Sequence, residues 1–288
     1  MKKRIYLIFI FIILMSLLGC TRVKTITIKE TKSDAPATVV KQPIAEEKSD
    51  ETTSIPAFDK NAVMLPSGKS VPILMYHSIA YEKDNPVRLP PANLEEQFKY
   101  LKVNGYYTIT LTDLYNYFMT DTPIPEKSVV LTFDDGYVDN YTAMLPVLKK
   151  YNFKATIFVI TGAIDKSANY LTSSQLIEME RYGVDIESHT VSHENLKDIS
   201  KDKQLETLIK SKEDLEKMLN KKVNFFAYPF GGYTKTSIEA VREAGYTMAI
   251  TTDGRWASKS DGIFSLHRVY ISGFHNIEEF KKRLTNTK

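Results

Sequence analysis

Two short motifs carry side chains that could hold a metal ion and a reactive water molecule. Asp134 and Asp135 close an apolar run, and adjacent carboxylates at a strand end diverge, so one can bind a metal while the other faces a water. His189 and His193 are four residues apart, and on a helical turn this spacing lets two imidazoles converge on one ion. Each motif alone has a simpler explanation. The acidic pair could be a solvated Asp-Asp-Gly turn, and the histidines could be two unrelated side chains. Together they supply the ligands of a catalytic zinc-type site with open positions.

The pattern of apolar segments places both motifs in an α/β fold. Runs typical of buried strands alternate with amphipathic stretches typical of helices. Strands are expected at 71–76, 106–110, 128–133, 155–160, 184–188, 225–228, 248–251 and 269–271, and helices between 93 and 105 and at 112–118, 143–151, 173–182, 201–219 and 237–244. This alternation predicts a parallel sheet that is closed or nearly closed. Both motifs follow strands, at the carboxyl ends where such barrels carry their chemistry.

Composition and charge exclude several classes of protein. The chain has 288 residues, of which 25% are charged and 43% hydrophobic, which excludes a wholly disordered chain and a polytopic membrane protein. The net charge is +3, and Lys2, Lys3 and Arg4 account for all of it. The remaining chain is neutral, so no nucleic-acid partner is expected. Cys20 is the only cysteine, which excludes an intrachain disulfide.

The N-terminus reads as a targeting segment. Three basic residues precede an apolar run from Ile5 to Leu18, which is shorter than the roughly 20 residues of a membrane span and typical of a signal-peptide core. The run ends in Leu-Leu-Gly-Cys, which resembles the lipobox of bacterial lipoproteins, whose cysteine becomes the lipidated first residue. We therefore expect a lipid anchor on Cys20 and a location on the extracellular face of the cytoplasmic membrane. An ordinary secretory signal with an incidental cysteine is the alternative.

Three segments follow from this interpretation. Residues 1–19 are expected to form the lipoprotein signal peptide, and residues 20–70 to comprise the lipidated cysteine and a flexible tether. The tether is rich in Thr, Lys, Glu, Ser and Pro and has Phe58 as its only aromatic residue, so it cannot bury enough apolar surface to fold. Residues 71–288 are expected to form the catalytic domain.

The motifs together resemble those of polysaccharide deacetylases, carbohydrate esterase family 4. Residues 132–136 read Thr-Phe-Asp-Asp-Gly, like the family's first motif, and residues 189–193 read His-Thr-Val-Ser-His, like its second. Residues 227–231 read Ala-Tyr-Pro-Phe-Gly, an altered form of the third. The resemblance extends from Pro72 to Arg268 and implies a distorted (β/α) barrel of about seven parallel strands.

The resemblance also assigns the metal site. Asp134 would be the general base, and Asp135, His189 and His193 would bind one divalent metal ion. Zinc is the expected ion, with cobalt, nickel and manganese as alternatives.

The altered third motif and a tryptophan would shape the substrate groove. By resemblance, Tyr228, Pro229 and Gly231 would line it, and the Phe230 backbone N–H would help to stabilise the oxyanion. Trp256 sits where the family places a wall for the acetyl methyl group; core packing is the alternative.

One departure from the family concerns the partner of the base. Many members carry an arginine at the position of Ala227, paired with the catalytic aspartate, and here Arg268 is the expected replacement. Its neighbour His267 resembles the fifth-motif histidine that protonates the leaving amine, with Asp253 as its possible orienting partner. A loop histidine without catalytic role is the alternative.

Two more histidines, His77 and His275, lie outside these motifs. His77 ends the first strand and is either a further substrate contact or a structural histidine, whereas His275 is expected at the surface.

The expected reaction is removal of acetyl groups from N-acetylglucosamine units by a monomeric enzyme. Peptidoglycan is the leading substrate because a tethered extracellular enzyme meets it first. Poly-N-acetylglucosamine comes next, because the Tyr-His-Ser segment after the first strand and the altered third motif look like that branch of the family. Chitooligosaccharides come third. A glycan-binding lipoprotein with weak or no catalysis is the rival class.

Overall fold

The computed structural model describes residues 58–59 and 61–285, and its centre is a curled parallel sheet. Seven strands lie in the order β7-β6-β5-β4-β3-β1-β8, and the short β2 pairs with the amino end of β3. Their bounds are β1 Ile73–Tyr76, β2 Tyr107–Thr108, β3 Ser128–Asp135, β4 Ala155–Val159, β5 Val184–Ser188, β6 Phe225–Ala227, β7 Met248–Ile250 and β8 Val269–Tyr270. The expected fold class, α/β with about seven parallel strands in a distorted barrel, is confirmed.

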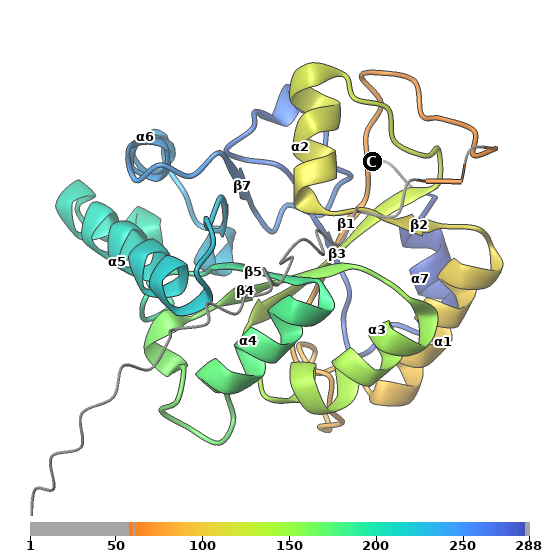
Figure 1. Ribbon diagram of the computed structural model, residues 1–288, viewed down its shortest axis with the longest axis horizontal. Coiled ribbons are helices and arrows are strands. Elements are labelled where there is room, and N and C mark those ends of the chain that lie inside the picture. Colours follow the sequence, from red (N-terminus) through yellow and green to blue (C-terminus); the bar gives the residue numbers. More distant parts are fainter. Residues whose placement is uncertain (1–57, 60, 286–288) are drawn as a thin grey trace, which may run out of the picture. The chain divides into compact units, whose positions relative to one another are not determined.

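Seven α-helices of the described chain surround these strands (Figure 1). They are α1 Pro91–Val103, α2 Leu111–Thr120, α3 Leu145–Tyr151, α4 Ser173–Tyr182, α5 Lys201–Leu219, α6 Lys235–Glu243 and α7 Ile277–Arg283. A π-helical turn at Asn140–Met144 precedes α3. None of the helices in the described part of the chain is both long and apolar enough to cross a membrane.

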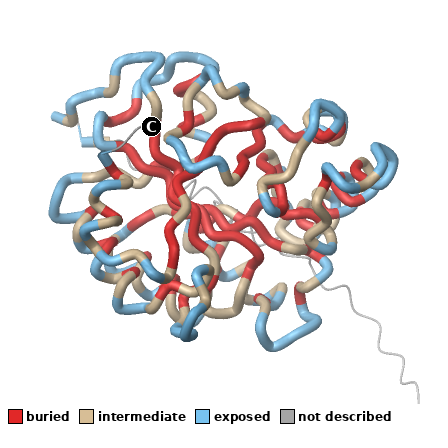
Figure 2. Tube along the Cα trace, turned by 180° about the vertical axis from the view of Figure 1, so that it is seen from behind, coloured by how far each residue is buried: buried red, intermediate tan, exposed pale blue. Residues whose placement is uncertain are grey.

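Successive side chains of a strand point to opposite faces of the sheet, so the apolar core has two parts. One set of strand side chains, such as Leu131 and Phe133, packs under α1, α3, α4, α5, α6 and α7. The intervening residues, such as Val130, face the inside of the curl, where Phe158 and Ile250 fill the space and α2 adds further apolar side chains. Figure 2 shows the strands as the buried centre of the molecule, with exposed residues on the surrounding loops and helices. Asp134 lies on the same inner face as Val130, four residues along β3.

The segment before β8 bridges the two edges of the curled sheet. Leu266 pairs in parallel with Ile250 of β7, and its N–H donates to the Ala249 carbonyl. Three residues later, Val269 pairs with Leu74 of β1. The chain therefore crosses from one edge of the sheet to the other within a few residues.

The observed elements follow the sequence expectations closely. The strand at 184–188 and the helices at 173–182 and 201–219 have the expected bounds. The helix expected from Thr112 begins at Leu111 instead, because Thr110 is its N-cap: the Thr110 hydroxyl accepts from the Asp113 N–H, and the Asp113 carboxylate accepts from the Thr110 N–H.

Contacts also form upstream of residue 71, where the sequence places the start of the catalytic domain. The Leu65 N–H donates to the Ile124 carbonyl, and the Glu126 N–H donates to the Val63 carbonyl. The Tyr117 hydroxyl donates to the Pro66 carbonyl. The predicted signal peptide, its cysteine and most of the predicted tether lie outside the described residues.

Candidate active site

The three predicted metal ligands meet at the carboxyl ends of β3 and β5. Asp135 is the last residue of β3, and His189 directly follows β5. The Nε2 atoms of His189 and His193 lie 3.5 and 3.3 Å from the same atom, Oδ1 of Asp135. One ligand atom from each residue lies within 4.8 Å of the other two. The structure therefore brings the three side chains together around one point.

The two histidines converge through a tight turn, not through a turn of helix as the spacing suggested. Thr190 and His193 have φ values of 66° and 60°, in the left-handed region. The N–H groups of Thr161 and Gly162 donate to the carbonyls of Thr190 and Val191 and hold the turn against the segment after β4. A Cβ at Gly162 would collide with the Val191 carbonyl oxygen, so this close approach requires glycine.

A main-chain oxygen orients His189. Its Nδ1 lies 2.7 Å from the carbonyl oxygen of Ala227. Because a carbonyl can only accept, Nδ1 carries the proton and the lone pair of Nε2 faces Asp135. Burial lowers the pKa of His189 against the opposing effect of Asp134 and Asp135. The imidazole is therefore neutral, the form that binds metals.

The ligand chemistry fits a divalent cation. Oδ1 of Asp135 is buried and has no hydrogen-bond partner among the described residues. Burial raises the pKa of Asp135, but His193, His189 and His77 outweigh burial and hold it well below its ordinary value. An ionised carboxylate with an unpaired buried oxygen, facing two imidazole nitrogens, is the donor set that zinc and similar ions take.

Asp134 forms a bidentate ion pair with Arg268 inside the curl of the sheet. Nη1 and Nη2 of Arg268 donate to Oδ1 and Oδ2 of Asp134 at 2.7 and 2.6 Å. Nε donates to the Thr251 carbonyl, and Nη1 also donates to the Thr132 hydroxyl. Both charged side chains are buried. The expected replacement for the arginine missing at Ala227 is therefore in contact with the acid it should serve.

This pairing sets the charge of Asp134. Burial raises the pKa of the carboxyl, but the Arg268 guanidinium, helped by His189 and His77, outweighs burial and leaves the pKa below its ordinary value. Asp134 is thus an ionised proton acceptor beside the metal ligands.

His77 belongs to this cluster, whereas His267 has other neighbours. The proximity of His77 contributes to the lowered pKa of both Asp134 and Asp135, and its ring meets Tyr270 edge-on with centroids 6.0 Å apart. Nδ1 of His77 is buried without a hydrogen-bond partner among the described residues.

The buried His267 ring lies between two acids and an arginine. Its Nε2 is 3.5 Å from Asp253 and its Nδ1 is 3.6 Å from Asp261, while Nη2 of Arg255 is 3.4 Å from Nε2. The proximity of Asp253 matches the expectation, but none of these neighbours is a metal ligand.

The loop after β6 brings one exposed ring to the metal ligands. Phe230 has a φ of 58°, and its ring lies with its centroid 4.4 Å from that of His193. Pro229 and Gly231 flank it in a single 3-10 turn.

Two predicted groove residues lie elsewhere. The Tyr228 side chain is fully buried against Phe226 and Tyr233, and its hydroxyl donates to the Phe264 carbonyl, so it cannot line a groove. The half-buried Trp256 packs on the core under the helices, and its indole N–H donates to the Arg283 carbonyl at the end of α7. The structure therefore supports the core-packing alternative for Trp256.

One tyrosine beside the metal ligand Asp135 and a second tyrosine that stacks on the first were missed by the sequence analysis. Tyr137 follows the Asp-Asp-Gly motif, and burial together with Asp135 raises the pKa of its hydroxyl. Its ring stacks on Tyr170, with centroids 5.4 Å apart and planes 16° apart. Tyr137 could have been suspected from its place after the motif, but Tyr170, far along the chain, carries no such signal.

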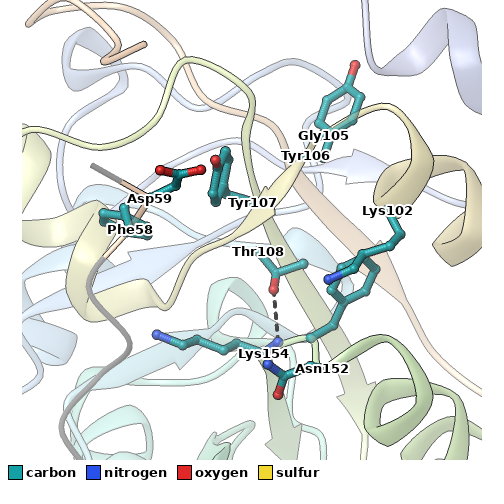
Figure 3. A pocket seen from close by; sticks show the side chains of 10 residues that line it. Phe58, Asp59, Lys102, Gly105, Tyr106, Tyr107, Thr108, Asn152 and Lys154 are labelled. Atoms are coloured by element: carbon teal, nitrogen blue, oxygen red, sulfur yellow. Dashed lines mark hydrogen bonds between the residues drawn. The ribbon is translucent and has the colours of Figure 1, made fainter. Parts of the chain in front are cut away.

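A separate cavity of about 320 Å³ lies away from this cluster (Figure 3). Its lining includes Tyr107, which pairs with the first residue of β3, and Lys154, which precedes β4. It is therefore at the amino ends of these strands, opposite the candidate site.

The fold and the site define a class of enzyme. A family model for polysaccharide deacetylase matches residues 121–249, which include all three ligand residues. The chain is also 37% identical to the putative polysaccharide deacetylase YxkH of Bacillus subtilis, over 79% of this chain and 78% of that protein. The chain therefore belongs to the polysaccharide deacetylase family, which is metal-dependent.

Two further relatives show the range of the family. The structure of the Streptococcus pyogenes deacetylase PplD, solved with acetate, matches with 33% identity and a TM-score of 0.72, over 76% of this chain and 99% of that one. A poly-beta-1,6-N-acetyl-D-glucosamine N-deacetylase of Staphylococcus aureus is 28% identical over 63% of this chain and 67% of that protein.

Replacing Arg268 tests the ion pair. Arg268→Ala should destabilise the fold by about 3–5 kcal/mol, because it leaves a buried carboxylate unpaired. Since burial alone raises the pKa of Asp134, the acidic limb of the kcat/KM profile should move to higher pH. Arg268→Lys keeps the charge but loses the bidentate contact, so its stability and its acidic limb should lie between those of the unmodified protein and Arg268→Ala. Urea unfolding, pH–rate profiles and metal content provide the measurements, and a wild-type acidic limb in Arg268→Ala would contradict the assignment.

Proposed function

We propose that the chain removes acetyl groups from N-acetylglucosamine units of a polysaccharide outside the cell, with a divalent metal ion, zinc in the first place, as its cofactor. One observation carries the proposal: Asp134, buried and held ionised by Arg268, adjoins the cluster of Asp135, His189 and His193. A positioned carboxylate beside a metal site is suited to activate water against an amide. The ion pair also argues against a glycan-binding protein without catalysis, because the cation missing at Ala227 is supplied from elsewhere.

Each residue of the cluster has a part in the reaction. When bound by Asp135, His189 and His193, the cation would polarise the acetyl carbonyl and lower the pKa of a water molecule. Asp134 accepts the proton of that water as it attacks the carbonyl carbon. Arg268 keeps the carboxylate ionised and fixes the direction of its oxygens.

The Phe230 main chain is the proposed donor to the oxyanion. Its N–H forms no hydrogen bond within the described residues, whereas the Gly231 and Gly232 N–H groups make the bonds of the turn. A fixed donor of this kind is typically worth about 3 kcal/mol in the transition state.

The leaving amine needs a proton, and the charge interactions of His77 with the two carboxylates favour it as the source. His77 is close enough to both carboxylates to affect their pKa, whereas His267 is surrounded by Asp253, Arg255 and Asp261. We therefore propose His77 as the proton donor and keep His267, the candidate from the family motif, as the second.

The choice of polymer rests on the proposed location of the enzyme. An enzyme held outside the cytoplasmic membrane meets the glycan of peptidoglycan first, so this is the leading substrate. Poly-β-1,6-N-acetylglucosamine is the second candidate, and the name of the Staphylococcus aureus relative favours it. The kcat/KM values for acetate release from the two purified polymers, measured side by side, decide between them.

Two substitutions distinguish the role of the general base from that of the metal ligands. Asp134→Asn should keep the metal and lose about 10²-fold to 10⁴-fold or more in turnover, the range of general acid–base catalysis. His189→Ala should lose metal and activity together. Elemental analysis and acetate release from both polymers measure these effects. Stoichiometric metal in His189→Ala, or normal turnover in Asp134→Asn, would contradict the assigned roles.

The two histidines can be ranked as proton donors. His77→Ala should reduce kcat by about 10²-fold to 10⁴-fold and flatten the alkaline limb of the pH–rate profile, with metal retained. His267→Ala should leave that limb in place. The opposite outcome, with a flattened limb only in His267→Ala, would return the role to the family's fifth motif.

The membrane anchor is proposed from the sequence and can be tested independently of catalysis. Cys20→Ser should release the protein from the membrane fraction and abolish labelling with a radioactive fatty acid, because the lipidated cysteine is removed. A variant that remains membrane-bound would point to an uncleaved hydrophobic N-terminus.

A further inference from the structure

The exposed aromatic rings of the described residues gather at the end of the barrel that carries the site. Tyr81, Phe230 and Phe274 are 75%, 66% and 64% exposed. They lie in the loops that follow β1, β6 and β8, so all three are on the carboxyl side of the sheet. Phe230 contacts a metal ligand, as described above. Tyr81 and Phe274 have no such role, and large exposed rings are typical of binding surfaces.

Tyr81 and Phe274 flank a cavity of about 170 Å³ between the loops after β1 and β8. Polar groups from Glu82, Asp84 and Arg88 line it together with the two rings. Nε of Arg88 lies 2.9 Å from Oε2 of Glu82, so these two charges are paired. Lys83 is a further lining residue, and the four charged side chains balance. The cavity is therefore suited to a neutral ligand with both apolar and polar surface.

The two loops hold each other in place. The Gly273 N–H and the Tyr270 hydroxyl both donate to the Pro86 carbonyl, at 2.7 and 2.8 Å. A Cβ at Gly273 would collide with the carbonyl oxygen of Arg88, so the approach of the loops requires glycine. The loop after β1 is also tied to the loop after β3, because the Ile79 N–H donates to the Asp139 carboxylate. The cavity is a formed feature of the fold.

One side chain connects this cavity to the histidine beside the metal ligands. Tyr270, which bonds one of its loops, packs against His77 beside the site. A ligand that fills the site could therefore extend past His77 into the cavity.

A pyranose ring has apolar CH faces and a polar rim of hydroxyl groups. Aromatic rings match the faces, and a few convergent polar side chains match the rim. In a linear glycan, the sugar beside the one being deacetylated supplies such a ring at a fixed distance.

We propose that the cavity between Tyr81 and Phe274 is a distal subsite for another N-acetylglucosamine unit of the same glycan chain. This inference rests on the proposed function. It makes the enzyme selective for chains of several sugars, since the shortest substrates cannot fill the metal site and the distal subsite together.

The test uses chain length as the variable. Acetate release is measured for Tyr81→Ala and Phe274→Ala with N-acetylglucosamine oligomers from the dimer to the hexamer. We expect kcat/KM of the unmodified protein to rise with length, and each variant to lose about tenfold on the longest oligomers and little on the dimer, as expected when a buried aromatic contact is truncated. Val103→Ala is the matched control, because Val103 at the end of α1 is also 75% exposed.

A binding measurement separates the two hypotheses. Tyr81→Ala, Phe274→Ala and Val103→Ala are each combined with Asp134→Asn, and the affinity of each double variant for the hexamer is measured by calorimetry. If the unmodified protein releases no acetate from any oligomer, but Tyr81→Ala weakens hexamer binding about tenfold, the reaction is wrong and the subsite stands. If Tyr81→Ala and Phe274→Ala match Val103→Ala at every length in both measurements, the subsite is wrong while the deacetylase activity remains.

Discussion

The ion pair between Asp134 and Arg268 joins the chemistry of this protein to the integrity of its barrel. Arg268 belongs to the segment that bridges β7 and β1, and its guanidinium also bonds the main chain after β7 and the Thr132 hydroxyl on β3. Both charges are buried. Removing one of them would leave the other buried without a partner, which would destabilise the fold by several kcal/mol. The same contact that holds the base ionised therefore fastens the bridging segment to the strand that carries the metal ligand Asp135.

The metal side of the site depends instead on backbone conformation. Asp135, Thr190, His193 and Phe230 all have positive φ values, which non-glycine residues rarely adopt. Such conformations persist only where surrounding contacts enforce them, and here the Thr161 and Gly162 N–H groups hold the histidine turn. Strain of this kind aims the side chains at one point, which neither a regular strand nor a regular helix would do.

The fold and the ligand set could be predicted because they depend on local patterns. Strands such as 184–188 are short apolar runs, and Asp135, His189 and His193 stand at strand ends, where parallel sheets gather their loops. The stacking of Tyr137 on Tyr170 and the cavity beside Tyr81 arise from loops that meet only in three dimensions, so no local pattern announces them. The sequence left two roles open for Trp256, and the bond to the Arg283 carbonyl, which favours core packing, is a contact that no local pattern predicts. The convergence of the histidines was predicted for the wrong reason, since spacing cannot reveal a left-handed turn.

The bond between His189 and Ala227 has a consequence for how this family can vary. His189 is oriented by the main-chain oxygen of residue 227, an atom that every amino acid provides. The side chain at that position is thus free to change without disturbing the metal ligand. By resemblance, other members place the arginine there, whereas this chain delivers the same positive charge to Asp134 from the neighbourhood of β8. A comparison made position by position would count a functional residue as lost. In space, the charge comes from the segment before β8 and still reaches the same carboxylate.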